Sequence, residues 1–221
     1  MFIDRRDAGI KLAQRLTKYR GQKGVLVLAL PRGGAVTGFE IARSLGVPLD
    51  VLIVRKIGFP GQPELAIGAV SETGAVVLNG SIISLYGVSE DYIKKEISRQ
   101  KEEISRRVKL YRKGESISEL EGKTIILVDD GVATGATVKA AIATLKKEKI
   151  TKLILALPVG PPDVAAELKE MVDDFICLEV PEYFGAVGAF YGDFTQVSDD
   201  EVVEMLERSV AGAGQEGARN G

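Results

Sequence analysis

Two adjacent carboxylates, Asp129 and Asp130, follow an apolar run at residues 124–128 and precede a turn of small and hydroxyl-bearing residues. Carboxylates at the end of a buried strand can accept hydrogen bonds from a pair of vicinal hydroxyls. The turn leads into a predicted helix at residues 138–149, so its backbone amides and the helix dipole would favour a phosphate. A ribose 5-phosphate would satisfy all of these groups at once.

The residues of this turn are suited to holding a phosphate at close range. Glycines let the backbone approach a ligand, and threonines add hydroxyl donors. The candidate phosphate-binding residues are Gly131, Val132, Ala133, Thr134, Gly135, Ala136 and Thr137. No Gly-Lys-Ser or Gly-Lys-Thr follows the turn, which excludes a P-loop for nucleoside triphosphates. The structural alternative is a buried strand that ends in a solvated Asp-Asp turn.

The run TIILVDDGVATGAT at residues 124–137 resembles the fingerprint of type I phosphoribosyltransferases. That fingerprint has four apolar residues, two acidic ones, two more residues, and then a small-Thr-Gly-x-Thr turn. The resemblance implies 5-phosphoribosyl 1-diphosphate as the donor, Mg2+ as the cofactor and pyrophosphate as a product. It also implies that Asp129 and Asp130 hold the ribose hydroxyls, and the metal only indirectly, through those hydroxyls or through water.

The order of apolar and helical segments predicts an α/β fold. Short apolar runs at residues 25–30, 50–54, 124–128 and 152–157 are candidate buried strands. They alternate with helical patterns at about residues 34–46, 137–149 and 162–172, which predicts a mainly parallel sheet. With the resemblance, this predicts the type I phosphoribosyltransferase fold: a five-stranded sheet flanked by helices, with a small C-terminal hood and a long helical insertion.

We expect a single domain over residues 1–210 and a disordered tail at residues 211–221. The parts expected within the domain are a core at about 22–172, a mobile lid at about 57–76, a helical insertion at about 80–120 and a hood at about 174–196. The insertion holds a long amphipathic helix at residues 89–113, which would pack on the core or on a second subunit in a homodimer. The alternative is a helix that caps the ligand through Arg106 or Arg107.

Two further loops carry basic residues. The run PRGG at residues 31–34 is similar to the pyrophosphate loop of the family, which implies diphosphate binding by Pro31, Arg32, Gly33 and Gly34. The resemblance also implies a cis peptide bond between Pro31 and Arg32. The run RKIGFPG at residues 55–61 is similar to one in adenine phosphoribosyltransferases, so Arg55 and Lys56 would join Arg32 in neutralising the diphosphate. An ordinary Pro-Gly turn and a solvated basic pair are the alternatives.

The segment DFICLEVPE at residues 174–182 is similar to the base-binding hood strand of hypoxanthine-guanine phosphoribosyltransferases. The resemblance implies that Phe175 stacks on the acceptor, that Ile176 offers backbone groups to it, and that Glu182 lies nearby. Aromatic residues at strand spacing also occur in ordinary cores. Glu64, Glu72 and Glu182 are candidates for deprotonating the acceptor.

Two departures leave the acceptor open. Ala133 stands where the 6-oxopurine enzymes have an acidic residue, and no lysine occurs near Pro158. We therefore expect transfer to a nucleobase or to another nitrogenous acceptor. The alternatives are a non-catalytic regulatory protein that binds the same diphosphate, and a degenerate member of the fold with no ligand.

Composition narrows the chemistry. The 221 residues include no histidine, which removes the commonest general base, the Ser-His and Cys-His nucleophile pairs, and most transition-metal sites. The single cysteine, Cys177, excludes an internal disulfide. A formal net charge of −2 gives no global basic field, so we expect no nucleic-acid partner. We expect no signal peptide or membrane span, and a cytoplasmic location.

Overall fold

The computed structural model describes residues 1–216, apart from the side chains of residues 63, 64 and 210–216. Where the sequence predicts one domain, this part of the chain forms two compact units. Unit 1 contains Met1–Val51, Ser118–Gly135 and the chain from Lys149 onward, and unit 2 contains Leu52–Ile117 and Ala136–Glu148. The expected boundaries of core, lid and hood stay predictions.

Unit 1 is built on a parallel sheet whose described strands lie in the order β2-β1-β6-β7-β8. The strands are β1 (Val25–Ala29), β2 (Leu49–Val51), β6 (Thr124–Val128), β7 (Lys152–Val159) and β8 (Asp174–Glu179). The predicted five-stranded α/β fold is therefore confirmed. In the register, Val128 pairs with Ala29 on one side and with Ala156 on the other. The loops that follow these strands consequently meet at one edge of the sheet.

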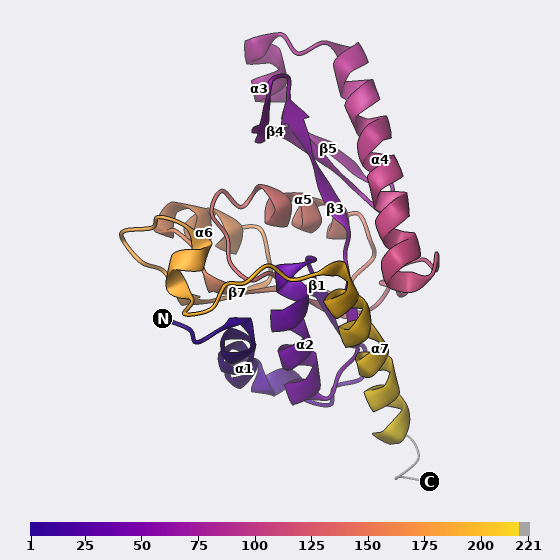
Figure 1. Ribbon diagram of the computed structural model, residues 1–221, viewed down its shortest axis with the longest axis vertical. Coiled ribbons are helices and arrows are strands. Elements are labelled where there is room, and N and C mark those ends of the chain that lie inside the picture. The colour runs from indigo at the N-terminus through magenta and orange to yellow at the C-terminus, as the bar shows by residue number, and fades with distance from the viewer. Residues whose placement is uncertain (217–221) are drawn as a thin grey trace. The chain divides into compact units, whose positions relative to one another are not determined.

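Helices cover both faces of this sheet. The helices of unit 1 are α1 (Arg5–Arg15), α2 (Gly33–Leu45), α6 (Pro162–Lys169) and α7 (Asp199–Glu216), with short 3-10 turns η1 (Thr17–Tyr19) and η2 (Val187–Phe190). Figure 1 shows α1, α2 and α7 side by side on one face. The connection from β1 to β2 contains α2, and the connection from β7 to β8 contains α6; the two run in opposite directions across the sheet. Because both crossovers are right-handed, α6 lies on the face opposite to α2. Asp4 begins α1 by accepting a hydrogen bond from the backbone of Asp7 at 2.8 Å.

The expected disordered tail at residues 211–221 lies partly outside the described part of the chain. Helix α7 continues to Glu216, and residues 217–221 lie outside the described part. Ser198 and Glu201 form a reciprocal capping box at its start, with the Ser198 backbone donating to Glu201 at 2.8 Å and the Glu201 backbone donating to Ser198 at 3.2 Å. Val202 and Leu206 are buried on one side of the helix, so both a start signal and an apolar stripe favour it.

Unit 2 contains an antiparallel sheet with its described strands in the order β3-β4-β5. The elements of this unit are β3 (Val54–Phe59), β4 (Gln62–Ser71), β5 (Val76–Leu78), α3 (Gly80–Tyr86), α4 (Glu90–Arg112) and α5 (Ala136–Leu145). The expected lid segment thus forms paired strands, joined at Pro60-Gly61 with a positive φ of 76° at the glycine, as a Pro-Gly turn requires. Its mobility stays a prediction.

The predicted long helix is confirmed as α4. Ser89 caps it by accepting a hydrogen bond from the backbone of Tyr92 at 3.3 Å. Ile93 packs with Ile57 and Ile67 of the antiparallel sheet in a buried cluster. The apolar stripe of α4 therefore packs within its own unit. None of the helices in residues 1–216 is long and apolar enough to cross a membrane.

Glu72 lies in a buried ion pair with Arg112 of α4, where their side chains are only 4% and 9% exposed. Its other carboxylate oxygen accepts a hydrogen bond from the backbone of Ile53 at 2.7 Å. These contacts give Glu72 a structural role in unit 2. They argue against the expectation that it deprotonates an acceptor, because its charge is already neutralised.

Removing one partner of this pair should destabilise the protein. Arg112→Met leaves the Glu72 carboxylate buried without its counter-charge, and we expect a loss of about 3–5 kcal/mol in the free energy of unfolding. The double variant with Glu72→Leu should recover most of that loss, because no unpaired charge remains. Urea unfolding of the three proteins tests this. A single variant as stable as the wild type would show that the pair contributes no such constraint.

Candidate functional site

Asp129 and Asp130 lie at the carboxyl edge of the unit 1 sheet, directly after β6. The strand before them is buried from Ile125 to Val128 and is flanked by β1 and β7. Asp129 turns its carboxylate back toward the chain and accepts a hydrogen bond from the Asp130 backbone at 2.9 Å. Both carboxylates are partly buried, so the predicted pair stands at the edge where ligands of parallel sheets bind.

The expected pyrophosphate loop lies against this pair. Leu30 donates its backbone N–H to Val128 at 2.9 Å, which keeps the chain after β1 beside the end of β6. A Cβ atom on Gly33 would overlap the Asp130 carboxylate, and one on Gly34 would lie 3.0 Å from the Asp129 Cα. Only glycine permits this approach at residue 33. The structure therefore brings together two motifs that the sequence separates.

The loop continues into helix α2. The peptide bond between Pro31 and Arg32 is cis, as the resemblance implies. Arg32 is the residue before the first turn of α2, and its carbonyl accepts a hydrogen bond from Ala35 at 3.0 Å. The backbone N–H groups of Gly33 and Gly34 thus belong to the first turn of a helix, where such groups lack intrahelical acceptors. This arrangement suits an anion beside the carboxylates.

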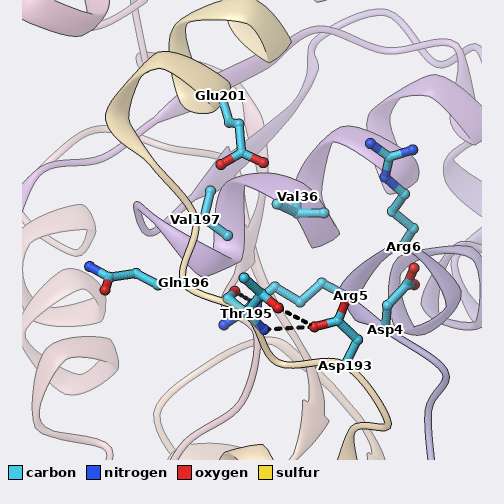
Figure 2. Close-up of a pocket in the computed structure, with 9 residues that line it drawn as sticks. All are labelled: Asp4, Arg5, Arg6, Val36, Asp193, Thr195, Gln196, Val197 and Glu201. Atoms are coloured by element: carbon cyan, nitrogen blue, oxygen red, sulfur yellow. Dashed lines mark hydrogen bonds between the residues drawn. The ribbon is translucent and has the colours of Figure 1, made fainter.

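Arg5 forms a salt bridge with Asp130 that the sequence did not predict. The Arg5 Nε lies 2.6 Å from Oδ2 of Asp130, and the Arg5 side chain also donates to the Thr195 carbonyl at 2.8 Å. Its guanidinium lies 3.7 Å from the centre of the Phe194 ring. Figure 2 shows Arg5 extending past Thr195 at the floor of a cavity of about 140 Å³, with Glu201 at the opposite side. Arg5 thus lines this cavity and also contacts Asp130.

Tyr191 holds the backbone of Asp130 from a second direction. Its hydroxyl donates to the Asp130 carbonyl at 2.6 Å. Its ring packs 5.3 Å from Phe2 and 4.9 Å from Phe194. Burial, followed by the negative charge of Asp130, raises the pKa of Tyr191, so the phenol stays protonated and remains a donor. The carboxylate turn is therefore fixed by residues from both ends of unit 1.

The Asp129 carboxyl has an unusual electrostatic environment. Burial raises its pKa well above the ordinary value, and the negative charge of Asp130 raises it further. The hydrogen bond from the Asp130 backbone and the charge of Arg5 act in the opposite direction. Asp129 therefore binds a proton more readily than an exposed aspartate.

The expected phosphate turn divides into two parts. Val132 is buried and donates its backbone N–H to Val159 at 2.9 Å, so its amide is already used within the fold. The assignment of Val132 to the phosphate site stays a prediction. Ala133 and Thr134 are exposed, and α5 begins at Ala136. A phosphate would therefore meet the later residues of the turn.

Gly131 and Gly135 have backbone conformations that suit glycine. Their φ angles are 141° and 71°. A Cβ atom on Gly131 would also lie 2.5 Å from the Val187 side chain and 3.0 Å from that of Val159. The chain can therefore turn away from β6 here only because side chains are absent.

Arg55 and Lys56 lie on β3 in unit 2, and side chains of successive residues on a strand point to opposite faces. Arg55 donates from Nε to Gln100 of α4 at 2.9 Å. Burial, then the positive charge of Arg107, lowers the pKa of Arg55, although it stays charged. The roles of Arg55 and Lys56 at a diphosphate stay predictions. Arg55 is engaged with α4.

Phe175 and Ile176 lie on β8 at the edge of the sheet. Leu155 pairs with Phe175 on one side and with Leu127 on the other, so Phe175 is level with a residue two positions before Asp129. Strand geometry places it about 7 Å back along the strands and about 10 Å across them. The roles of Phe175 and Ile176 at an acceptor stay predictions.

The chain after β8, residues 180–195, comes closer to the carboxylates. It supplies Tyr191, and its rings of Phe184 and Phe190 stack 5.5 Å apart. Glu182 lies near the start of this segment and is exposed. Glu64 belongs to the side chains outside the described part. The roles of these candidate bases stay predictions.

The family model described as "Phosphoribosyl transferase domain" matches residues 4–194 of the chain. The chain belongs to the phosphoribosyl transferase domain family. It is 46% identical over 211 residues to a Mycobacterium tuberculosis protein named "Putative phosphoribosyl transferase Rv0571c", an alignment that covers 95% of this chain and 47% of that protein. This phosphoribosyl transferase domain therefore spans about half the length of the curated relatives it matches.

Solved structures agree with this membership. The crystal structure of TT1426 from Thermus thermophilus is 41% identical, with a TM-score of 0.81, and the match covers 94% of this chain and 98% of that one. The AQ2163 protein from Aquifex aeolicus is 12% identical with a TM-score of 0.51, over 91% of this chain and 84% of that one. The second likeness shows the fold alone.

Crowding at Gly33 leads to a prediction for this phosphoribosyl transferase domain. The methyl group of Gly33→Ala would overlap the Asp130 carboxylate and lie 2.9 Å from the Arg5 Nε. We expect a loss of about 1–3 kcal/mol in the free energy of unfolding, because the salt bridge must shift. Gly80→Ala is the control, since its methyl group would meet no described atom within 4 Å. Urea unfolding should place the control within about 0.5 kcal/mol of the wild type.

The raised pKa of Asp129 predicts a pH-dependent stability change. The folded protein holds this proton to a higher pH than the unfolded chain does, so the ionised carboxylate costs stability above the raised pKa. Below the ordinary pKa of an unfolded aspartate that cost is absent. Asp129→Asn should therefore raise the free energy of unfolding at neutral pH, with a gain that shrinks as the pH falls. Asn can still accept the hydrogen bond from the Asp130 backbone.

Urea unfolding over a pH series measures this effect. Asp163→Asn is the control, because Asp163 is exposed in the first turn of α6. An Asp129→Asn variant that is less stable than the wild type at neutral pH would contradict the raised pKa. A gain of equal size at every pH would do the same.

Proposed function

We propose that this chain is a phosphoribosyltransferase that uses 5-phosphoribosyl 1-diphosphate and transfers the phosphoribosyl group to a nitrogenous acceptor. One observation carries the proposal. The Asp129-Asp130 pair and the glycines of the loop after β1 adjoin at one edge of the sheet, although about a hundred residues separate them in the sequence. A donor with vicinal hydroxyls, a 5-phosphate and a diphosphate matches these neighbouring groups.

The carboxylates would hold the ribose. Asp129 and Asp130 would accept hydrogen bonds from its two hydroxyls, because ionised carboxylates are strong acceptors. The later part of the turn, from Ala133 to Thr137, would bind the 5-phosphate through backbone N–H groups and threonine hydroxyls. Gly131 and Gly135 would allow the backbone to bend around it.

The loop after β1 would bind the leaving diphosphate. Arg32 would supply positive charge, and the backbone N–H groups of Gly33 and Gly34 at the start of α2 would donate to its oxygens. Arg55 and Lys56 stay candidates for further cations, as the resemblance to adenine phosphoribosyltransferases implies. Stabilising the leaving group and positioning the reactants would provide most of the rate enhancement.

The donor set fits Mg2+. This ion is usually held by one or two carboxylates together with substrate phosphates, and it keeps several waters. Asp129 and Asp130 would hold it indirectly, through the ribose hydroxyls or water. Among the described residues, no group of three or more His, Cys, Asp or Glu side chains could hold a metal ion. When bound, Mg2+ would neutralise part of the diphosphate charge.

The reaction itself is a substitution at C1 of the ribose. The bond from C1 to the diphosphate oxygen breaks, the acceptor nitrogen forms a bond to C1, and the acceptor loses a proton. We assign the acceptor side to Phe175 and Ile176 of β8 and to the following residues 180–195, of which Tyr191 contacts the Asp130 carbonyl. Glu182 is the remaining candidate base from the sequence in this segment. The cytoplasmic location, the homodimer and the lack of a nucleic-acid partner stay predictions.

Titration calorimetry with 5-phosphoribosyl 1-diphosphate and Mg2+ tests the donor. We expect the wild type to bind. The double variant Asp129→Asn with Asp130→Asn should lose at least about a hundredfold in affinity, because two charge-assisted hydrogen bonds are lost. The exposed variant Asp163→Asn should bind like the wild type. A double variant that keeps its affinity would remove the ribose assignment.

A pyrophosphate-release screen over purines, pyrimidines and small amines then tests catalysis. Release that depends on one acceptor would identify the substrate. Donor binding without release on any acceptor would favour the non-catalytic regulatory alternative. If the folded wild type does not bind the donor, the chain is a member of the fold that lacks this ligand.

A further inference from the structure

Arg5 has no part in the proposed function so far. It nevertheless forms a salt bridge with one member of the carboxylate pair. Only 8% of its surface is exposed, which is unusual for an arginine. Its Nε donates to Oδ2 of Asp130 at 2.6 Å. The two residues are 125 positions apart in the sequence, so this contact depends on the complete unit 1 fold.

The Arg5 side chain is held in one position by its surroundings. One terminal nitrogen donates to the Thr195 carbonyl at 2.8 Å, and the guanidinium carbon lies 3.7 Å from the centre of the Phe194 ring. Gly33 closes a third side, since a Cβ atom there would lie 2.9 Å from Nε. A guanidinium fixed in this way acts as a directional donor as well as a charge.

We propose that Arg5 is a positioning residue for the donor sugar, which holds the Asp130 carboxylate in the orientation that receives a ribose hydroxyl and places a positive charge beside the pair. This inference rests on the proposed function. Arg5 acts through Asp130, and it need not touch the substrate.

Two physical effects separate this role from simple packing. The first is geometric: Arg5 engages Oδ2, while Tyr191 fixes the carbonyl of the same residue at 2.6 Å. Together they restrict both the side chain and the backbone of Asp130. A lysine at position 5 would keep the charge but lose the fork of guanidinium donors.

The second effect is electrostatic. The groups that face Asp129 are Asp130 beside it, Arg5 from α1 and the Tyr191 phenol. The charge of Arg5 lowers the pKa of Asp129, against burial and the charge of Asp130. Without that charge the pKa of Asp129 rises further, so the carboxylate is lost to protonation at a higher pH.

The experiment measures the affinity for 5-phosphoribosyl 1-diphosphate with Mg2+ over a pH series, by calorimetry on the full chain. For Arg5→Gln we expect affinity about tenfold weaker or more at neutral pH. We also expect the acid limb of the binding profile to move to higher pH. For Arg5→Lys we expect a limb close to that of the wild type, because the charge remains, but weaker binding, because the geometry is lost.

Arg6→Gln is the matched control. It removes the same charge one residue along the same helix, from an exposed side chain that faces away from Arg5 in Figure 2. It should keep both the affinity and the pH limb of the wild type. Thermal unfolding of every variant separates weakened binding from lost structure.

The outcomes distinguish this inference from the function on which it rests. If the wild type does not bind the diphosphate, both proposals fall. If the wild type binds and a folded Arg5→Gln keeps the same affinity and the same acid limb, the positioning role alone is overturned. Should Arg5→Gln not fold, Arg5→Lys decides: weaker binding at an unchanged melting temperature supports the role, and unchanged binding overturns it.

Discussion

Two adjacent carboxylates at the end of a buried strand repel each other and lose much of their hydration, and this electrostatic cost constrains the rest of unit 1. Burial and the neighbouring charge together raise the pKa of Asp129. Such a pair persists only where other groups offset part of the cost. Arg5 supplies a positive charge, and the Tyr191 hydroxyl satisfies the Asp130 carbonyl. The first helix and the chain after β8 are therefore tied to the same two residues.

Parallel strand order explains how such distant residues meet. The carboxyl ends of β1, β6 and β7 reach the same edge of the sheet, so the loops after them share one location. Gly33 and Gly34 can lie against the carboxylates because they carry no side chains. This edge of the sheet therefore needs both charged residues and residues without side chains, and different segments of the chain supply them.

The sequence predicts the parts of the site whose chemistry is local. The Asp-Asp turn, the PRGG loop and the helix at residues 89–113 are each indicated by residue types within a short window, and the two loops lie where a parallel sheet should place them. Arg5 and Tyr191 gave no such signal. A charged residue at the start of an amphipathic helix normally points to solvent, and only the tertiary fold brings it to a partner 125 positions away.

Some parts of the fold depend on long-range geometry that residue types do not reveal. Strand register places Phe175 level with Leu127, two residues before Asp129. Strand alternation turns the side chains of Arg55 and Lys56 to opposite faces, although they are neighbours in the chain. The start of α7 differs in kind, because Ser198 and Glu201 form a capping box whose residue types are visible in the sequence.

In a chain without histidine, neighbouring carboxylates can take different chemical roles only if their environments differ, and in this site they do. Asp129 and Asp130 are identical neighbours, but one is governed by burial and the other is held by a buried guanidinium. Different environments for paired carboxylates are a common way to give them different roles. In the proposed reaction the leaving diphosphate carries most of the developing charge, so the protein needs acceptors and cations in fixed positions more than a strong base. The Arg5 salt bridge provides such a fixed position at the sugar, at the point where the fold must already offset a repulsion.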